Sequence, residues 1–264
     1  MGSGWYLGGY RSGYRGQGYV PGYPPLSAGV LPPSTNMVSW YKADSLGLTT
    51  GTAISTWTDS APGSTATATQ AGAQRPIFQT NILNGLPGVQ FDGSTQFFQD
   101  SNNIQGATTS YIVFKQTSTT GVQSAYTLKG SSGPLLAELV LLTVGGYTPY
   151  TWVNDVTSAA GVGLSNALDT NAHALMYSYN GGTNSSTSSY AANLDNSAAT
   201  VTASGGDTRS SGDLASIGAR CNSAGTGSNF FNGYIFERII YSGVQSSGDK
   251  ATVIAYLNFR YGVA

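Results

Sequence analysis

The two glutamates of the chain are the residues that could supply acid chemistry. Retaining glycoside hydrolysis uses two carboxyl groups held about 5 to 5.5 Å apart. Glu138 and Glu237 are the only glutamates, and neither has an acidic residue two or four positions further along. On a strand those spacings would place a second carboxyl on the same face. The spacing therefore predicts that the chain is not an enzyme, and we expect Glu237 to occupy an ordinary outward strand position.

The chain has few residues that could act as nucleophiles or bind a metal ion. His173 is the single histidine and Cys221 the single cysteine. No Gly-x-Ser-x-Gly motif presents a serine nucleophile, and no Gly-x-x-x-x-Gly-Lys motif cradles a phosphate. One histidine and one cysteine build neither a transition-metal cluster nor a disulfide. We expect His173 to be a hydrogen-bonded strand residue, and we assign no metal ligands and no cofactor.

Calcium is the ion for which the chain offers candidate ligands. The segments Asp100-Ser101-Asn102-Asn103 and Asp207 to Asp213 could supply carboxylate and amide oxygens of the type that calcium binds. Acids in such segments are usually turn formers, whose side chains bond nearby backbone groups. The spacing is not diagnostic, so both interpretations stay open.

Aromatic residues beside an amide form the best candidate for a sugar-binding site. Tyr147, Tyr150 and Trp152 lie in one short segment with Asn154. Flat rings stack on sugars, and a few placed polar groups fix their orientation. A strand that buries its rings in the core needs the same residue types, so the sequence leaves both interpretations open.

The composition indicates an all-β chain. Of 264 residues, 9% are charged, the net charge is -1, and there are 36 glycines and 10 prolines. Many short strands and turns produce this pattern, and an all-β sandwich of this length is commonly one domain. The low charge does not favour binding to nucleic acid or an anionic membrane. No segment approaches the roughly 18 apolar residues of a membrane span, and the N-terminus lacks the apolar stretch of a secretory signal.

Recurrent apolar runs between Gly, Asn, Pro and Ser clusters predict the strands that carry these residues. The runs are 37–41, 111–114, 135–143, 172–179 and 234–241. The second and third are nearly continuous, which is typical of inner strands covered on both faces. The polar region 181–213 predicts loops or an edge strand instead.

The last segment predicts a short C-terminal helix. Ser246 is a cap candidate, and an acidic residue follows in the first turn. We expect Val253, Ile254 and Leu257 to pack against the sandwich. Phe259 and Tyr261 should then finish the chain in the core or on an edge strand.

Residues 1–36 differ from the rest of the chain. They contain five tyrosines, five prolines, frequent glycines and no acidic residue. Because Gly costs about 1 kcal/mol and Pro about 3 kcal/mol per helical position, we expect an extended segment that reaches at most about 120 Å. A flexible linker is one interpretation, but the aromatic and arginine content favours an arm that contacts a partner. The candidate contact residues are Trp5, Tyr6, Tyr10, Arg11, Tyr14, Arg15, Tyr19 and Tyr23.

Two stretches carry a resemblance to a known superfamily. The first comprises Trp40-Tyr41-Lys42-Ala43-Asp44, Ser55 to Ser60, Arg75-Pro76 and Asn84 to Gly93; the second comprises Phe231 to Tyr241 and Tyr256 to Gly262. Together they resemble the concanavalin A-like lectin/glucanase superfamily, specifically the laminin-G-like jelly rolls of bacteriophage virion proteins and bacterial surface proteins. The resemblance implies a jelly-roll β-sandwich over 37–264, with the arm outside it. Trp40 and Trp57 are then expected in the core, and Phe91-Asp92-Gly93 at a strand end followed by a turn.

The resemblance and the arm together suggest a function. The leading hypothesis is a non-catalytic virion protein, either capsid decoration or a tail or fibre component. Its arm would bind neighbouring capsid or tail subunits, and many copies or a homo-oligomer would display the jelly roll at the virion surface. The alternative is a carbohydrate-binding adhesin on a virion or on a bacterial cell surface, in which the chain could be a mature form whose signal has been removed. A degraded or unrecognised glycanase is a third, weaker hypothesis.

Overall fold

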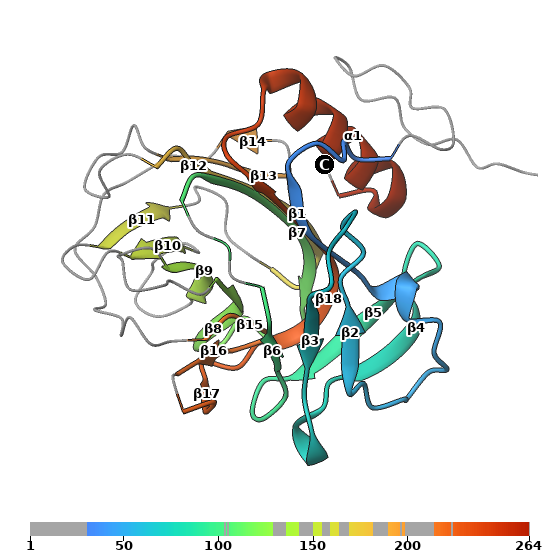
Figure 1. The fold of residues 1–264 in the computed structure, drawn as a ribbon. Coiled ribbons are helices and arrows are strands. Elements are labelled where there is room, and N and C mark those ends of the chain that lie inside the picture. Colours follow the sequence, from blue (N-terminus) through green and yellow to red (C-terminus); the bar gives the residue numbers. More distant parts are fainter. Residues whose placement is uncertain are drawn as a thin grey trace, which may run out of the picture.

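The computed structural model shows an antiparallel β-sandwich with one α-helix packed on it. It describes residues 31–102, 104, 106–128, 136–142, 150–154, 159–163, 169–181, 190–195, 197–198, 214–222 and 224–263. In Figure 1, helix α1 (Ser247–Tyr261) and strands β8 to β11 lie on opposite sides of the curved sheet that contains β7, β12 and β18. The predicted all-β jelly-roll sandwich with a C-terminal helix is confirmed.

Sheet A is the sheet that carries the helix. Its order is β14-β13-β12-β7-β18-β5-β4, and β1 pairs with another part of the long strand β18. The bounds are β1 (Met37–Lys42), β4 (Ile77–Leu83), β5 (Leu86–Asp92), β7 (Thr108–Gln116), β12 (Ala172–Tyr179), β13 (Tyr190–Leu194), β14 (Ser197–Ala198) and β18 (Asn232–Ser242).

Sheet B covers the other side of the core, in the order β11-β10-β9-β8-β15-β6-β3-β2. Its strands are β2 (Thr56–Thr58), β3 (Thr67–Thr69), β6 (Phe98–Asp100), β8 (Val122–Thr127), β9 (Leu136–Leu142), β10 (Tyr150–Asn154), β11 (Ala159–Gly163) and β15 (Ser216–Ile217). The remaining elements are the hairpin of β16 (Arg220–Cys221) and β17 (Gly227–Ser228), and the 3-10 turns η1 (Ala43–Leu46) and η2 (Gly72–Gln74).

Apolar residues from alternate strand positions fill the space between the sheets. The fully buried Trp57 meets the rings of Tyr41 and Phe98 edge-on, at centroid distances of 5.4 and 6.0 Å. This geometry is the favoured one for aromatic pairs. Trp40 is also buried, on the outer face of sheet A, so both tryptophans are core residues as predicted.

Strand β7 has the burial expected of an inner strand. Every side chain from Thr108 to Gln116 is buried except Lys115, which is partly exposed. Its even-numbered residues face sheet B, whereas Tyr111 and Val113 face the helix. The side chains of β9 lie outside the described residues, so the same prediction for 135–143 stays a prediction.

A β-bulge in β18 determines which of two neighbouring charged residues faces the helix and which faces the space between the sheets. The register with β7 shifts between Ile235 and Glu237, which leaves Phe236 as the extra residue. Phe236 and Glu237 therefore both face the helix, and Arg238 turns into the space between the sheets. Such a bulge re-aims side chains without ending the strand.

Arg238 forms an ion pair with Asp100 across the sandwich. Both side chains are fully buried, and the guanidinium also donates to the hydroxyl of Ser39 at 3.0 Å. The ring of Tyr41 lies 4.9 Å from the guanidinium, and the Tyr41 hydroxyl donates to Asp100 at 2.9 Å. Burial alone would lower the pKa of Arg238, but the charge of Asp100 raises it. The pair links β18 of sheet A to β6 of sheet B.

Helix α1 begins and ends with the expected signals. Ser246 is the N-cap, and its hydroxyl accepts from the backbone N–H of Asp249 at 3.1 Å. Gly262 ends the helix with φ 65, a left-handed conformation that favours glycine. Val253, Leu257 and Tyr261 are buried against sheet A as predicted.

The prediction for Phe259 was wrong. Its side chain is 39% exposed, because the helix continues to Tyr261 and turns this position toward solvent. The prediction had placed Phe259 and Tyr261 in the core or on an edge strand, and of the two only Tyr261 is buried.

The turn after β5 has the predicted chemistry. The carboxylate of Asp92 accepts from the backbone N–H groups of Ser94, Thr95 and Gln96 at 2.8 to 3.0 Å. Gly93 has φ 73, a conformation that costs glycine no side-chain strain. The Asp-Gly pair is therefore a structural turn.

Two other expectations concern the polar region and the arm. Strands β13 and β14 form one edge of sheet A, as predicted for 181–213, although 182–189 and 199–213 lie outside the described residues. Residues 1–30 of the arm also lie outside them; Leu31 is exposed and β1 begins at Met37.

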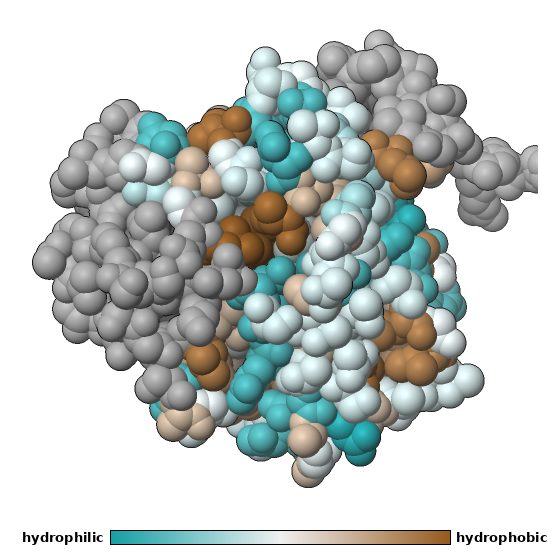
Figure 2. Space-filling model, in the orientation of Figure 1, coloured by the Kyte–Doolittle hydropathy of each residue, from teal (hydrophilic) through white to brown (hydrophobic). Residues whose placement is uncertain are grey.

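On the side shown in Figure 2, the coloured surface is mostly hydrophilic or intermediate, with hydrophobic residues in separate groups. No helix in the described part of the chain is long and apolar enough to cross a membrane.

The ion pair generates a stability prediction. Asp100→Asn should lower the free energy of unfolding by about 3 to 5 kcal/mol, because it leaves the buried Arg238 charge without its counter-ion. Urea unfolding measures the change. The matched control is Asp44→Asn, which breaks the partly exposed pair with Arg260 and should cost about 0 to 1 kcal/mol. Equal losses of unfolding free energy in the two variants would contradict the assignment of a buried ion pair to Asp100 and Arg238.

Candidate functional site

Glu237 has a structural position beneath the helix. Its carboxylate accepts from the indole N–H of Trp40 and from the hydroxyls of Tyr256 and Tyr261, the last two at 2.9 and 2.8 Å. Burial raises its pKa, and the charge of Arg260 offsets only part of this effect. Glu237 is 1% exposed, so the expected outward position was wrong: the residue faces outward from the sheet, but α1 covers it.

The first calcium candidate is already engaged by protein groups. The Asp100 carboxylate bonds Arg238 and Tyr41, and the side chain of Asn102 donates to Asp100 at 3.0 Å and to Asp59 at 3.1 Å. Asn103 and 207–213 lie outside the described residues. Within the described part of the chain, no group of three or more His, Cys, Asp or Glu side chains could hold a metal ion. Calcium binding at the other candidate residues stays a prediction.

His173 is a hydrogen-bonded strand residue, as predicted. On β12, its Nδ1 lies 2.6 Å from Asp195 and its Nε2 lies 3.1 Å from Asp169. Burial alone would lower its pKa, but the hydrogen bonds and charges of Asp195 and Asp169 outweigh this and raise it. The side chain bridges two loops. Cys221 is buried in the small cluster with Phe97.

The proposed sugar-binding residues lie on one strand of sheet B. Tyr150, Trp152 and Asn154 occupy alternate positions of β10 and therefore share one face of the sheet. Tyr147 lies outside the described residues. The same holds for the candidate contact residues of the arm, which are Trp5, Tyr6, Tyr10, Arg11, Tyr14, Arg15, Tyr19 and Tyr23.

The pairing register shows which face this is. Thr127 of β8 pairs with Glu138 of β9, Glu138 pairs with Trp152, and Trp152 pairs with Gly161 of β11. Directly paired residues share a face. The neighbouring residue of β8, Tyr126, belongs to the core between the sheets. The row that contains Glu138 and Trp152 therefore lies on the opposite face, away from that core.

The register places Tyr150 and Trp152 on the face opposite Tyr126. Thr127, in the row of Trp152, is itself buried, so the use of these rings for sugar binding or for packing stays a prediction. The register also brings Glu138 into the row of Trp152, which the sequence alone did not indicate. Strand pairing joins residues 14 positions apart, and a single sequence carries no direct signal of that register.

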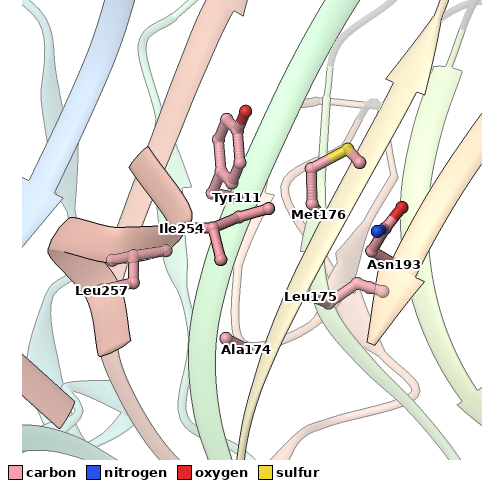
Figure 3. Close-up of a pocket in the computed structure, with 7 residues that line it drawn as sticks. All are labelled: Tyr111, Ala174, Leu175, Met176, Asn193, Ile254 and Leu257. Atoms are coloured by element: carbon pink, nitrogen blue, oxygen red, sulfur yellow. The ribbon is translucent and has the colours of Figure 1, made fainter. Parts of the chain in front are cut away.

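A second surface feature is an apolar groove between α1 and sheet A (Figure 3). In this view Ile254 and Leu257 of the helix lie opposite the strands that carry Tyr111 and Ala174, with Met176 further along. Leu175 and Asn193 complete the lining. The groove offers few polar groups to orient a ligand.

The fold can be compared with solved structures. Domain 4 of AbnA, an extracellular GH43 arabinanase from Geobacillus stearothermophilus solved with arabinotriose, matches with a TM-score of 0.58 and 12% identity, covering 83% of this chain and 98% of that one. The chain has a jelly-roll β-sandwich fold. It matches no protein-family model and no curated protein sequence.

Two further structures match at lower TM-scores. The CBM40 domain of a Ruminococcus gnavus sialidase has a TM-score of 0.45 and 15% identity, covering 63% of this chain and 96% of that one. A Trypanosoma rangeli sialidase has a TM-score of 0.47 and 13% identity, covering 91% of this chain and 36% of the sialidase.

The histidine bridge generates a pH prediction. Because folding raises the pKa of His173, the bridge stabilises the fold fully below the ordinary histidine pKa of about 6.5, and the contribution is lost as the pH rises through the folded-state pKa. The difference in unfolding free energy between wild type and His173→Gln should be about 1 kcal/mol at pH 5.5 and shrink toward pH 9, since both carboxylates are partly exposed. Urea unfolding across this range measures it; a constant difference would contradict the bridge.

Proposed function

We propose that the domain 37–264 is a non-catalytic carbohydrate-binding module that uses the face of β10. The observation that supports the proposal is the register of sheet B, in which Tyr150, Trp152 and Asn154 take alternate positions of β10 on the side opposite the row of Tyr126. We infer that their rings serve sugar stacking rather than core packing.

The residue types on this face suit a neutral sugar. The rings of Tyr150 and Trp152 would stack on its C–H groups, while the amide of Asn154 bonds hydroxyl groups. Glu138, directly opposite Trp152 in the register, adds a carboxylate that accepts from hydroxyls. Opposite Trp152 on the other neighbouring strand, Gly161 has no side chain to block approach.

The comparison with solved structures supports a binding role. Domain 4 of the arabinanase, whose fold this chain shares over 98% of that domain, was solved with arabinotriose. A jelly-roll sandwich of this kind therefore holds a sugar in that protein. The fold alone does not select a function, and the β10 residues carry the proposal for this chain.

The absence of catalysis is part of the proposal. Glu138 and Glu237 each lack an acidic residue two or four positions further along, and Glu237 is used to hold α1. The virion location, the anchoring arm and its capsid or tail partners stay predictions, since residues 1–30 lie outside the described part of the chain. A binding module of this kind fits either a virion or a bacterial cell surface.

The variant Trp152→Ala tests the proposed sugar-binding site most directly. Trp152→Ala should weaken the strongest glycan-array interaction by about tenfold or more, because it removes the stacking surface. Phe259→Ala, which removes an exposed ring from α1, is the matched control and should bind as the wild type does. Undiminished binding by Trp152→Ala would place the sugar elsewhere and contradict the β10 site.

A variant of Glu138 tests sugar binding and catalysis separately. We expect no release of reducing sugar from any oligosaccharide that the protein binds, and we expect Glu138→Gln to weaken binding by no more than about tenfold, since one hydrogen bond to a charged group is lost. Reducing-sugar assays and titration calorimetry measure the two properties. Hydrolysis that disappears in Glu138→Gln would overturn the non-catalytic assignment.

A further inference from the structure

A second set of residues stands on the part of sheet A that α1 leaves uncovered. The register aligns one residue from each of five adjacent strands, β4, β5, β18, β7 and β12, in a single row on the outer face. The row is Ile77, Gln90, Tyr234, Lys115 and Ala172. All five are partly exposed, whereas the residues on either side of Gln90, Tyr234 and Lys115 in their strands are buried.

Tyr234 is the aromatic centre of this row and is held rigidly. Its ring stacks on Phe236 at a centroid distance of 6.4 Å and an interplanar angle of 26°. Phe236 is fully buried and lies over Gly88, where an added Cβ would come within 2.9 Å of the Phe236 ring. The Tyr234 ring is therefore packed against Phe236 and is partly exposed beside this contact. The lack of a side chain at Gly88 is what lets the ring pair lie this close to the sheet.

The residues beside Tyr234 offer hydrogen-bond donors. The side-chain oxygen of Gln90 accepts from the amide of Gln79 at 2.8 Å, which fixes its orientation, and its own NH2 group has no hydrogen-bond partner among the described residues. On the other side, the ammonium of Lys115 has no carboxylate within 4 Å in the described part of the chain. Adjacent strands are about 4.8 Å apart, so the two donors flank the ring closely.

Lys115 is the one charged residue of this row. Asp92, in the next row on β5, keeps its negative charge: burial would raise its pKa, but the N–H groups of Ser94, Thr95 and Gln96 donate to its carboxylate and lower the pKa. Its neighbour across the register, Asn232, contributes only an amide. The charge of Lys115 is therefore the one in this row available to a ligand.

We propose that the row of Gln90, Tyr234 and Lys115 is a second binding site, specific for a glycan that carries a carboxylate, such as a uronic acid. The sugar ring stacks on the exposed face of Tyr234, its carboxylate pairs with Lys115, and Gln90 donates to a hydroxyl. This arrangement matches the combination of an aromatic surface and a few oriented polar groups that sugar sites use. An uncharged sugar would leave the ammonium without its ionic partner.

This site is independent of the one proposed on β10. The β10 residues lie on the outer face of sheet B, and the Tyr234 row lies on the outer face of sheet A, on the opposite side of the core. The two sites differ in charge and share no residue. A chain with both would bridge two glycan segments, and each site can fail without the other.

The test uses the full-length chain with two defined probes. Trigalacturonate carries carboxylates, and a neutral galactotriose of similar size does not; calorimetric titration gives the affinity for each. Lys115→Gln should weaken trigalacturonate binding about tenfold and remove most of its salt dependence, while Tyr234→Ala should weaken it at least as much. The matched controls are Lys250→Gln and Phe259→Ala, on α1, and both should bind as the wild type does. Thermal unfolding verifies that every variant is folded.

Three results would overturn the proposal: no binding of trigalacturonate by the wild type, equal binding in wild type and Lys115→Gln, or equal losses in Lys115→Gln and Lys250→Gln. If Tyr234→Ala proves unstable, Gln90→Ala replaces it, and unchanged affinity in that variant would also count against the site. Trp152→Ala separates the two sites, since it should leave trigalacturonate binding intact. Loss of the acidic glycan in Trp152→Ala alone would assign that ligand to β10 and contradict this inference.

Discussion

The β-bulge at Phe236 is the constraint on which the rest of the structure depends. One extra residue in β18 lets Glu237 face the helix while Arg238 faces the opposite sheet. Glu237 then accepts two hydrogen bonds that fix α1 and a third from Trp40 of β1, and Arg238 forms the buried ion pair that joins the two sheets. Without the bulge, strict alternation would send Phe236 and Arg238 to one face and Glu237 to the other. Phe236 itself shares the outer face with Tyr234 and lies over Gly88, where its ring packs against that of Tyr234.

Much of this fold could be predicted from the sequence because local chemistry determines it. The apolar run 172–179 became β12 with the predicted bounds, Ser246 capped the helix, and Asp92 formed the turn after β5. These features depend on neighbouring residues, whose spacing is visible in the chain. Phe259 was misplaced because the end of a helix depends on where its last carbonyl groups find partners, here at Gly262.

The candidate sites could be predicted only in part, because pairing between distant strands creates them. The aromatic and amide residues of β10 were recognised by type, but their face followed from the register through β8 and β9. The row of Tyr234 was not recognised at all, since its residues are spread over positions 77 to 234 and each is unremarkable in its own segment. Glu237 appeared to be an ordinary outward residue until α1 covered it. One sequence contains no direct information on these long-range alignments.

The measurement that most directly tests the central claim is backbone amide chemical-shift mapping with the oligosaccharide that binds best on a glycan array. The account predicts chemical-shift perturbations that saturate as the sugar site fills and that are largest for residues 136–142, 150–154 and 159–163. The perturbations of the core strand β7 should be smaller. Perturbations confined to other strands, or none at saturating sugar, would contradict the assignment of a carbohydrate-binding face to β10.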